Sequence, residues 1–519
     1  MILLVRLLTI RDGRWRVMAK SGKEQTKKQQ FWGGRLQEAP EALNISYCAG
    51  RDVAGRPMAD AVLVPYDVWQ NKAHVSMLCR EKIIKPALAA RILTALDSYD
   101  KLIATGERCL CPEKEDVHTN IEHFVAETEG PNISGVMHSG RSRNDQCTTV
   151  VRMFLRDRVM EFGLSLCELI SALLDFAEKN KRVPVGGYTH YQPASVTSVG
   201  HWFCSHAQAL MRDVDRLLSC YDRINISPLG AAASFGTGWA INRELTARLM
   251  GFREVQVNSL DCVTNRWEME ADAGSAVSFA MTHLSILAQD IVMLSNPHIG
   301  VLRLADRFVT GSSIMPQKRN PDFCEVTRAK ATLIEHLCGS LFGIARGVFS
   351  GYNRDTQWSK YVIMDLLDEA REAPAIFRGV VSSMSVDKDR SNELAQSNFI
   401  NAVDIADALA RKSGLPFRKT YEIVSVAVKL CDGKGSLDPK VVEELALKEA
   451  SKHVKLSIGT PMQILESKKH TGAPSPKAVQ EHIGVMREKL LEMRGQWQKN
   501  HNALDAARSD LEKLRKAFI

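Results

Sequence analysis

The sequence predicts a mainly α-helical protein in three parts, with a bundle of long helices at its centre. Two observations carry this prediction. Apolar residues recur at spacings of three and four over long stretches, and the strict alternation typical of a half-buried strand is scarce. With 519 residues, 33 Gly and 18 Pro, the chain can bury a large core and has too little Gly and Pro for a collagen or a low-complexity protein.

The longest apolar seam begins after residue 151. Over about six helical turns it forms the narrow stripe with which long helices pack side by side. The seam comprises Leu155, Val159, Phe162, Leu166, Leu169, Leu173 and Phe176. Similar stripes run over 207–221, 273–292 and 322–344, and the tail repeats Leu490, Trp497, Leu504 and Leu511 at intervals of seven. We expect this tail to be a terminal helix packed on its own chain or on a second copy, rather than a helix for another partner.

The composition changes along the chain and suggests four segments. We expect a flexible N-terminal extension at 1–30, an N-terminal helical domain at 31–140, a central helical bundle at 141–390 and a C-terminal helical domain at 391–519. The first ten residues are apolar except for Arg6, yet they are too short for a membrane span and no small-residue cleavage site follows. We therefore expect a cytoplasmic protein without a membrane partner.

Charge and cysteine content exclude several functions. The chain has 68 Lys and Arg against 60 Asp and Glu, a net charge of +8, and no block of like charge typical of a nucleic-acid-binding tail. Its 12 cysteines include no C-x-x-C pair, which favours reduced cysteines acting as small buried apolar side chains. Cys109 and Cys111 lack the further ligands that a metal site needs, so we expect no metal.

The most informative segment runs from Gly311 to Pro321 and reads GSSIMPQKRNP, with Glu325 shortly after it. Gly311 allows a sharp turn, and Ser312 supplies a hydroxyl close to backbone N–H groups. Lys318 and Asn320 offer a cation and an amide at a helix N-terminus, where a carboxylate binds well. A polar loop that only caps the helix is the alternative, and the intact run argues against it.

A second polar segment, 138–146, reads HSGRSRNDQ and comes directly before the first long helix. Its two arginines and Asn144 have the chemistry to bind a second carboxylate, because a guanidinium matches a carboxylate in a two-pronged geometry. Helix capping and salt bridging explain the same residues equally well.

A third segment, 187–193, reads GYTHYQP and places His190 between hydroxyl and amide side chains before another long helix. Most single histidines are structural, but these neighbours favour a functional one. His118 lies in a further polar stretch, 115–122, and no HExxH motif or i, i+4 histidine pair supports a zinc site. The absence of a Walker loop, a GxGxxG and a G-x-S-x-G motif disfavours nucleotide-phosphate and α/β-hydrolase chemistry.

These segments resemble the argininosuccinate lyase branch of the aspartase/fumarase superfamily. The stretch from Gly311 to Asn320 resembles the signature loop of the superfamily, and the other motifs follow in the order of the branch between about residue 31 and about residue 430. The other motifs are Trp32–Arg35, Ser139–Gln146, Gly187–Gln192, Pro228–Gly230, Asn258–Asp261, Met281–Ser285 and Tyr352–Asp355.

The resemblance implies a three-part fumarase/aspartase-type fold whose central helices form the core of a homotetramer. It also implies active sites built from loops of three subunits and a reversible β-elimination that releases fumarate from an N-succinyl substrate, without a cofactor. The proton that must be removed has a high pKa, so stabilising the doubly charged aci-carboxylate is expected to be the largest catalytic term.

The resemblance also implies roles for individual residues. Ser312 is the base, Glu325 pairs with His190, and Lys318 and Asn320 hold the reacting carboxylate. A serine hydroxyl is a poor base unless its alkoxide is stabilised, so Ser312 should depend on backbone donors, a helix dipole and closure of a mobile loop. The further substrate contacts implied are Arg143, Asn144, Thr189, Tyr352, Gln357 and Lys360.

Argininosuccinate, split into arginine and fumarate, is the default substrate, but this sequence departs from the branch near the predicted amine end. The serine that helps bind the amino acid is only partly matched by Ser46, and Arg56 stands near that position if the alignment has no gap. Trp358, Ser359 and Tyr361 replace residues that are usually acidic. An aminopolycarboxylate such as ethylenediamine-N,N'-disuccinate is therefore the alternative substrate.

Four other functions are less favoured. Retention of the predicted catalytic residues argues against a structural protein of the lens-crystallin kind. The segments 139–146 and 352–357 argue against fumarase, aspartase and adenylosuccinate lyase.

Overall fold

A computed structural model describes residues 8–11, 14–17, 41–49, 58–433, 435–457 and 459–518. Within the predicted N-terminal extension, β1 (Leu8–Arg11) and β2 (Arg14–Val17) pair antiparallel. The remainder of that extension, the motif Trp32–Arg35 and Arg56 lie outside the described residues, as does the side chain of Ser46.

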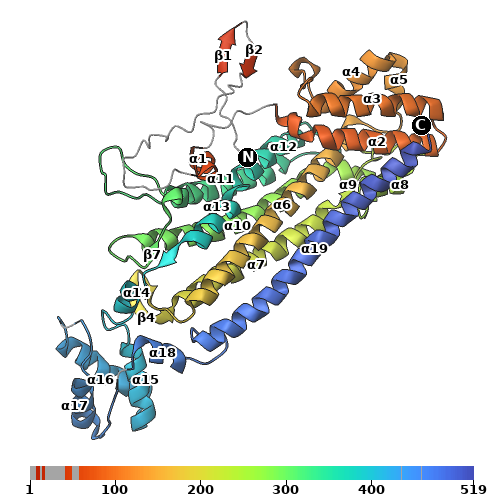
Figure 1. The fold of residues 1–519 in the computed structure, drawn as a ribbon. Coiled ribbons are helices and arrows are strands. Elements are labelled where there is room, and N and C mark those ends of the chain that lie inside the picture. Colours follow the sequence, from red (N-terminus) through yellow and green to blue (C-terminus); the bar gives the residue numbers. More distant parts are fainter. Residues whose placement is uncertain are drawn as a thin grey trace.

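The N-terminal part is helical: α2–α5 gather at one end of the molecule, whereas α1 lies against α11 (Asp322–Ala345) and α13 (Ala373–Ser383) of the central bundle (Figure 1). Its helices are α1 (Ala42–Ala49), α2 (Val64–Arg80), α3 (Pro86–Ala104), α4 (Val117–Glu129) and α5 (Pro131–Met137), with short 3-10 turns η2 (Ala59–Leu63) and η3 (Pro112–Lys114). Proline stands at the first turn of α2, α3 and α5, where its missing N–H costs no hydrogen bond.

Long helices lying side by side form the centre of the molecule (Figure 1). They are α6 (Arg143–Asn180), α7 (Val199–Ile224), α10 (Arg266–Ser295), α11 (Asp322–Ala345), α12 (Ser359–Ala370) and α13 (Ala373–Ser383), with the short helices α8 (Arg243–Leu249) and α9 (Ser259–Thr264) beside them. The whole predicted seam on α6 is buried. The expectation of a mainly α-helical protein with a central long-helix bundle is confirmed.

The terminal helix α19 (Pro476–Lys516) lies along α6 and α7 in the same core. Trp497 is fully buried and meets the Tyr221 ring edge-on, with 5.7 Å between the ring centroids. Gly163 leaves the space for this indole, because a Cβ there would lie 2.5 Å from Trp497 Cζ2. The heptad-spaced tail therefore packs on its own chain.

A smaller helical unit follows the central bundle and encloses a core of its own. It consists of α15 (Ala402–Ser413), α16 (Phe417–Leu430) and α17 (Pro439–Ala450). It is joined to the bundle through α14 (Lys388–Leu394) and α18 (Pro461–Ser467) and lies at the end opposite α2–α5 (Figure 1). The boundary at residue 391 stays a prediction.

Strands are few and short in the described part of the chain, and one pair bears on the site. The polar segment 187–193 belongs to the antiparallel hairpin of β3 (Pro184–Thr189) and β4 (Gln192–Ser198). Its glycines and prolines hide the alternating pattern. Glycine is needed at position 187 because a Cβ would lie 2.9 Å from the Ser195 carbonyl oxygen. The other pairs are β5 (Ile226–Ser227) with β6 (Glu254–Val255) and β7 (Leu302–Arg303) with β8 (Ser385–Val386).

Helix α10 is long and apolar enough to cross a membrane by length and composition. One side of it is packed inside the chain, where Ala273, Ala280 and Leu284 are fully buried. Phe279 and Ile286 on the same helix are each 52% exposed. The apolar character of α10 thus reflects a buried face and a second, outward apolar face.

Candidate active site

The loop between β7 and α11 carries the predicted base and is pinned at both ends. Thr310 and Asn320 exchange two backbone hydrogen bonds of 3.0 and 2.8 Å, and the Asn320 side-chain amide donates to the Gly311 carbonyl at 3.2 Å. At the turn, Ser312 Oγ accepts from the backbone N–H groups of Met315 at 3.2 Å and Ile314 at 3.4 Å. These donors point at the oxygen that would carry negative charge as an alkoxide.

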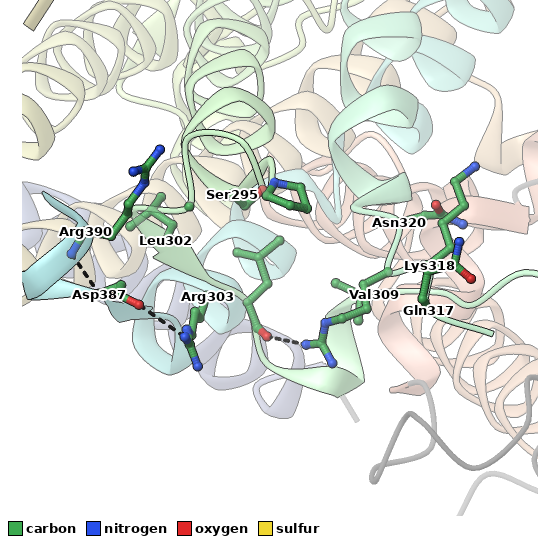
Figure 2. Close-up of a pocket in the computed structure, with 13 residues that line it drawn as sticks. Ser295, Leu302, Arg303, Val309, Gln317, Lys318, Asn320, Asp387 and Arg390 are labelled. Atoms are coloured by element: carbon green, nitrogen blue, oxygen red, sulfur yellow. Dashed lines mark hydrogen bonds and ion pairs between the residues drawn. The ribbon is translucent and has the colours of Figure 1, made fainter. Parts of the chain in front are cut away.

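Lys318 and Asn320 line a cavity of about 990 Å³ at the foot of this loop (Figure 2). The three arginines in its lining are engaged within the protein: Arg303 with Asp387 at 3.1 Å, Arg390 with Glu393 at 2.8 Å, and Arg319 with Asp306 and the Leu304 carbonyl. Lys318 is exposed and forms no ion pair in the described part of the chain. It is the lining cation that is available to an anionic ligand.

His190 occupies the two-residue turn of the β3–β4 hairpin. His190 and Tyr191 have φ values of 54° and 61°, the left-handed conformation that a type I′ turn requires and that costs a non-glycine residue energy. His190 is exposed and lines a second cavity of about 590 Å³, beside Trp202, Asp290 and Arg328. Such strain in a histidine next to a cavity is typical of a functional turn.

The predicted pair of His190 and Glu325 is not formed within one chain. Glu325 is exposed in the first turn of α11, and no hydrogen bond or ion pair joins it to His190 among the described residues. Thr189, at the end of β3, is exposed beside His190.

Arg143 and Asn144 are the first residues of α6. The residues on either side of them, Ser142 and Asp145, cap the helix. Ser142 and Asp145 form a reciprocal capping box, and the Asp145 carboxylate also accepts the backbone N–H of Gly230 at 2.8 Å. Arg143 keeps 44% of its side chain exposed and reaches the carboxylates of Glu115 and Asp116, which directly precede α4. This guanidinium lies at the surface, where it can meet a further carboxylate.

Tyr352 and Gln357 lie between α11 and α12, and Lys360 is in the first turn of α12. Tyr352 Oη donates to Gln357 Oε1 at 2.9 Å, and both side chains remain at least partly exposed. Lys360 differs, because it is 2% exposed and its Nζ lies 2.6 Å from Asp60 Oδ1. The Lys360 ammonium also sits 5.0 Å from the centroid of the Tyr361 ring.

A buried charged cluster beneath these residues escaped the sequence analysis. Arg266 Nη2 donates to Cys147 Sγ at 3.2 Å, and His118 Nδ1 lies 2.9 Å from Asp67 Oδ1. All four residues are more than 90% buried. One signal was available in the sequence: Cys147 follows Arg143 by four residues and so lies on the same side of α6.

Burial and charge shift the pKa values in this cluster in opposite directions. Burial alone would raise the pKa of the Cys147 thiol, but Arg266, a hydrogen bond with His118 and Lys360 lower it to about 6. For His118, burial is outweighed by the Asp67 carboxylate, which raises the pKa to about 10. Burial raises the pKa of Glu270 to about 7 although Arg266 opposes the shift. In the described part of the chain, no group of His, Cys, Asp and Glu side chains is arranged to hold a metal ion.

The predicted site residues form two groups that lie at opposite ends of the long central helices. Arg143 starts α6, and His190 follows its far end; a helix of 38 residues is about 55 Å long. Asn320 and Tyr352 are likewise separated by the 24 residues of α11, about 35 Å. A single chain therefore does not bring Ser312, Lys318 and His190 to Arg143, Tyr352 and Lys360.

Comparison with known proteins supplies the class of the molecule. Residues 66–335 match the family model described as "Lyase", and residues 399–466 match "Argininosuccinate lyase C-terminal". Together with the bundle and the loop around Ser312, these matches define a carbon–nitrogen lyase of the fumarate-releasing kind.

Individual relatives show to which branch of this family the chain belongs. The argininosuccinate lyase of Pelotomaculum thermopropionicum is 35% identical over 89% of this chain and 99% of its own length. That of Thermus thermophilus is also 35% identical, over 87% and 97%. The chain belongs to the argininosuccinate lyase branch of the aspartase/fumarase superfamily.

Solved structures share the fold over nearly the full length. A variant of EDDS lyase with bound fumarate matches 93% of this chain and 97% of its own, at 28% identity and a TM-score of 0.84. The EDDS lyase complex with formate gives a TM-score of 0.83 at the same identity, covering 93% of this chain and 96% of its own. A class II fumarase from Schistosoma mansoni, at 16% identity and a TM-score of 0.64 over 86% and 95%, shares the fold alone.

Proposed function

We propose that this protein eliminates fumarate from argininosuccinate and leaves arginine, with ethylenediamine-N,N'-disuccinate as the alternative substrate. The observation that carries this proposal is the loop around Ser312. Two backbone N–H groups donate to Ser312 Oγ, and Lys318 on the same loop is free of internal partners in the described part of the chain. A hydroxyl with stabilised negative charge beside a free cation suits removal of a proton next to a carboxylate.

In the proposed reaction, Ser312 takes the proton from the carbon adjacent to the substrate carboxylate. The electron pair left behind moves onto that carboxylate as an aci-carboxylate dianion, which Lys318 and Asn320 stabilise by charge and hydrogen bonding. The dianion then collapses to the fumarate double bond. The C–N bond breaks with its electrons on nitrogen, which is protonated as the amine or guanidine leaves.

The remaining predicted residues divide between the two ends of the substrate. Thr189 and His190 would contact the succinyl portion, with Glu325 orienting His190. Arg143 and Asn144 would bind a further carboxylate, and the part that leaves would contact Tyr352, Gln357 and Lys360. The mixed polar and aromatic character of Tyr352 and Trp358 admits either a guanidine or an aminopolycarboxylate.

We propose that the site is completed in a homotetramer. The two groups of site residues are separated by about 35 to 55 Å along α11 and α6, further than a small N-succinyl molecule reaches. The outward apolar residues of α10 and α11 support burial between copies. They are Phe279, Ile286, Leu333 and Phe342, and each is 45% to 52% exposed.

The decisive experiment measures fumarate by ultraviolet absorbance after the purified protein is mixed separately with argininosuccinate and with ethylenediamine disuccinate. We expect release from one of them, and the ratio of kcat/KM identifies the substrate. A folded tetramer that releases no fumarate from either compound would refute the proposed reaction.

Co-expression of two inactive variants tests whether each active site is built from more than one subunit. Ser312→Ala and Arg143→Ala should each be inactive, but co-expressed chains should regain part of the activity because some sites then receive both intact groups. Ser312→Ala with Lys318→Ala is the matched control, since both residues come from one loop and no mixed site is intact. Recovery in the control, or its absence in the first pair, contradicts a site shared in this way.

A further inference from the structure

Arg266 is a buried arginine whose guanidinium donates to sulfur. It is 1% exposed, its Nη2 lies 3.2 Å from Cys147 Sγ, and its Nε has no hydrogen-bond partner among the described residues. A buried guanidinium cannot shed its charge at neutral pH and is costly without an anionic partner. The identity of that anion decides the charge of the cluster.

The other cations of the cluster already have carboxylates. Lys360 is paired with Asp60 at 2.6 Å and His118 with Asp67 at 2.9 Å. Glu270 lies one turn after Arg266 on α10, but its Oε1 accepts from Ser359 Oγ at 3.3 Å and its Oε2 has no partner in the described part of the chain. The direct contact of Arg266 is therefore the thiol group.

We propose that Cys147 is a thiolate in the folded protein and a positioning residue for the amine end of the site, where it balances Arg266 and holds Lys360 in place. This inference rests on the proposed function, in which Lys360 contacts the leaving portion of the substrate. Cys147 follows Arg143 by one helical turn, so its sulfur lies directly beneath the segment proposed to bind the substrate carboxylate.

Charges from three helices face the sulfur, and their combined sign favours the thiolate. They are Arg266 and Glu270 of α10, His118 of α4 and Lys360 of α12. Three of the four are cationic at neutral pH, and Glu270 has its pKa raised to about 7 by burial. Cys204, for comparison, has a pKa raised to about 12 by burial.

The first test is spectroscopic and needs no substrate. The ultraviolet absorbance of thiolate is titrated between pH 5 and 9 in the full-length protein, and the titration of Cys147→Ser is subtracted. We expect one cysteine to ionise with a titration midpoint near pH 6, because Arg266 and His118 lower the pKa of the Cys147 thiol. A difference that appears only above pH 8 would overturn the thiolate assignment, whatever the protein catalyses.

The second test separates positioning from simple packing. In Cys147→Ser, KM for the N-succinyl substrate should rise about tenfold, the scale of one hydrogen bond to a charged group, with a smaller change in kcat. Cys147→Asp, which keeps the negative charge, should recover part of the lost affinity. The KM of the wild type should approach that of the serine variant as the pH falls below 6.

Cys204→Ser is the matched control, because Cys204 is also buried and no charged side chain contributes to its pKa. Its KM should equal that of the wild type from pH 5 to 8. A Cys147→Ser variant that loses thermal stability but keeps the wild-type KM profile would reduce Cys147 to a packing residue. If the wild type acts on no N-succinyl compound, the proposed function fails while the absorbance titration still decides the thiolate.

Discussion

Lys360 Nζ and Asp60 Oδ1 lie 2.6 Å apart although 300 residues separate them in the chain. Both side chains are at most 6% exposed. The contact ties α12 to the short turn η2, and Asp60 also accepts the backbone N–H of Val117 at 3.2 Å, which holds the start of α4. One carboxylate thus joins three segments that surround the proposed amine end of the site.

Replacing Asp60 by Asn should strongly destabilise the protein. The Lys360 ammonium would remain buried without its counter-charge, and breaking a buried pair in this way costs about 3–5 kcal/mol. Thermal or chemical denaturation measures the loss. Asp510→Asn is the matched control: Asp510 pairs with Lys513 at 3.2 Å on the exposed side of α19, and its loss should cost less than about 1 kcal/mol. Equal effects in the two variants would show that the Lys360 pair is solvated.

Ser312→Ala should abolish turnover and leave the oligomer unchanged. The substitution removes the oxygen that Met315 and Ile314 stabilise and touches no buried side chain. Fumarate release measures the activity, and light scattering measures the mass of the assembly. Ser313→Ala, on the exposed side of the same loop, is the control and should keep most of the activity. Dissociation of the Ser312 variant would make this serine an interface residue instead.

The stability of the protein should fall between neutral and high pH because of His118. Its folded-state pKa is raised to about 10 by Asp67 against the opposing effect of burial, while the unfolded value is about 6.5. Since the folded state holds the proton more tightly, this stabilisation is complete below pH 6.5 and is lost as the pH rises toward 10.

His118→Gln provides the comparison, because glutamine does not titrate. The difference in melting temperature between the wild type and this variant should be largest near pH 6 and shrink steadily up to pH 10. A difference that is constant over this range would mean that the imidazole at position 118 is neutral when buried beside Asp67.

Gly163→Ala should weaken the packing of α19 on α6. The new Cβ would lie 2.5 Å from Trp497 Cζ2 in a fully buried contact, and such overpacking costs about 1–3 kcal/mol. Gly495→Ala, on α19 itself, meets no atom within 4 Å and should instead stabilise its helix by up to about 1 kcal/mol. Chemical denaturation of both variants measures the contrast. Stabilisation by Gly163→Ala would contradict the close approach of the two helices.

Local sequence accounts for much of this fold. The seam of α6, the start of α11 at Asp322 and the heptad tail of α19 were predictable because helical periodicity and terminal residues act over a few turns. The hairpin of β3 and β4 was not, since Gly186, Gly187 and Pro193 serve backbone approach and turn geometry and leave no alternating pattern.

The sequence by itself determined the class of the molecule, because the loop from Gly311 to Asn320 is a contiguous segment whose chemistry is visible in its order of residues. Only the tertiary structure decided which charges meet. Asp60 with Lys360, and Cys147 with Arg266, are brought together by helices packed from distant parts of the chain. It also separated His190 from Arg143 by the length of α6. Helix periodicity is a local property, whereas the pKa of a side chain depends on every segment packed around it.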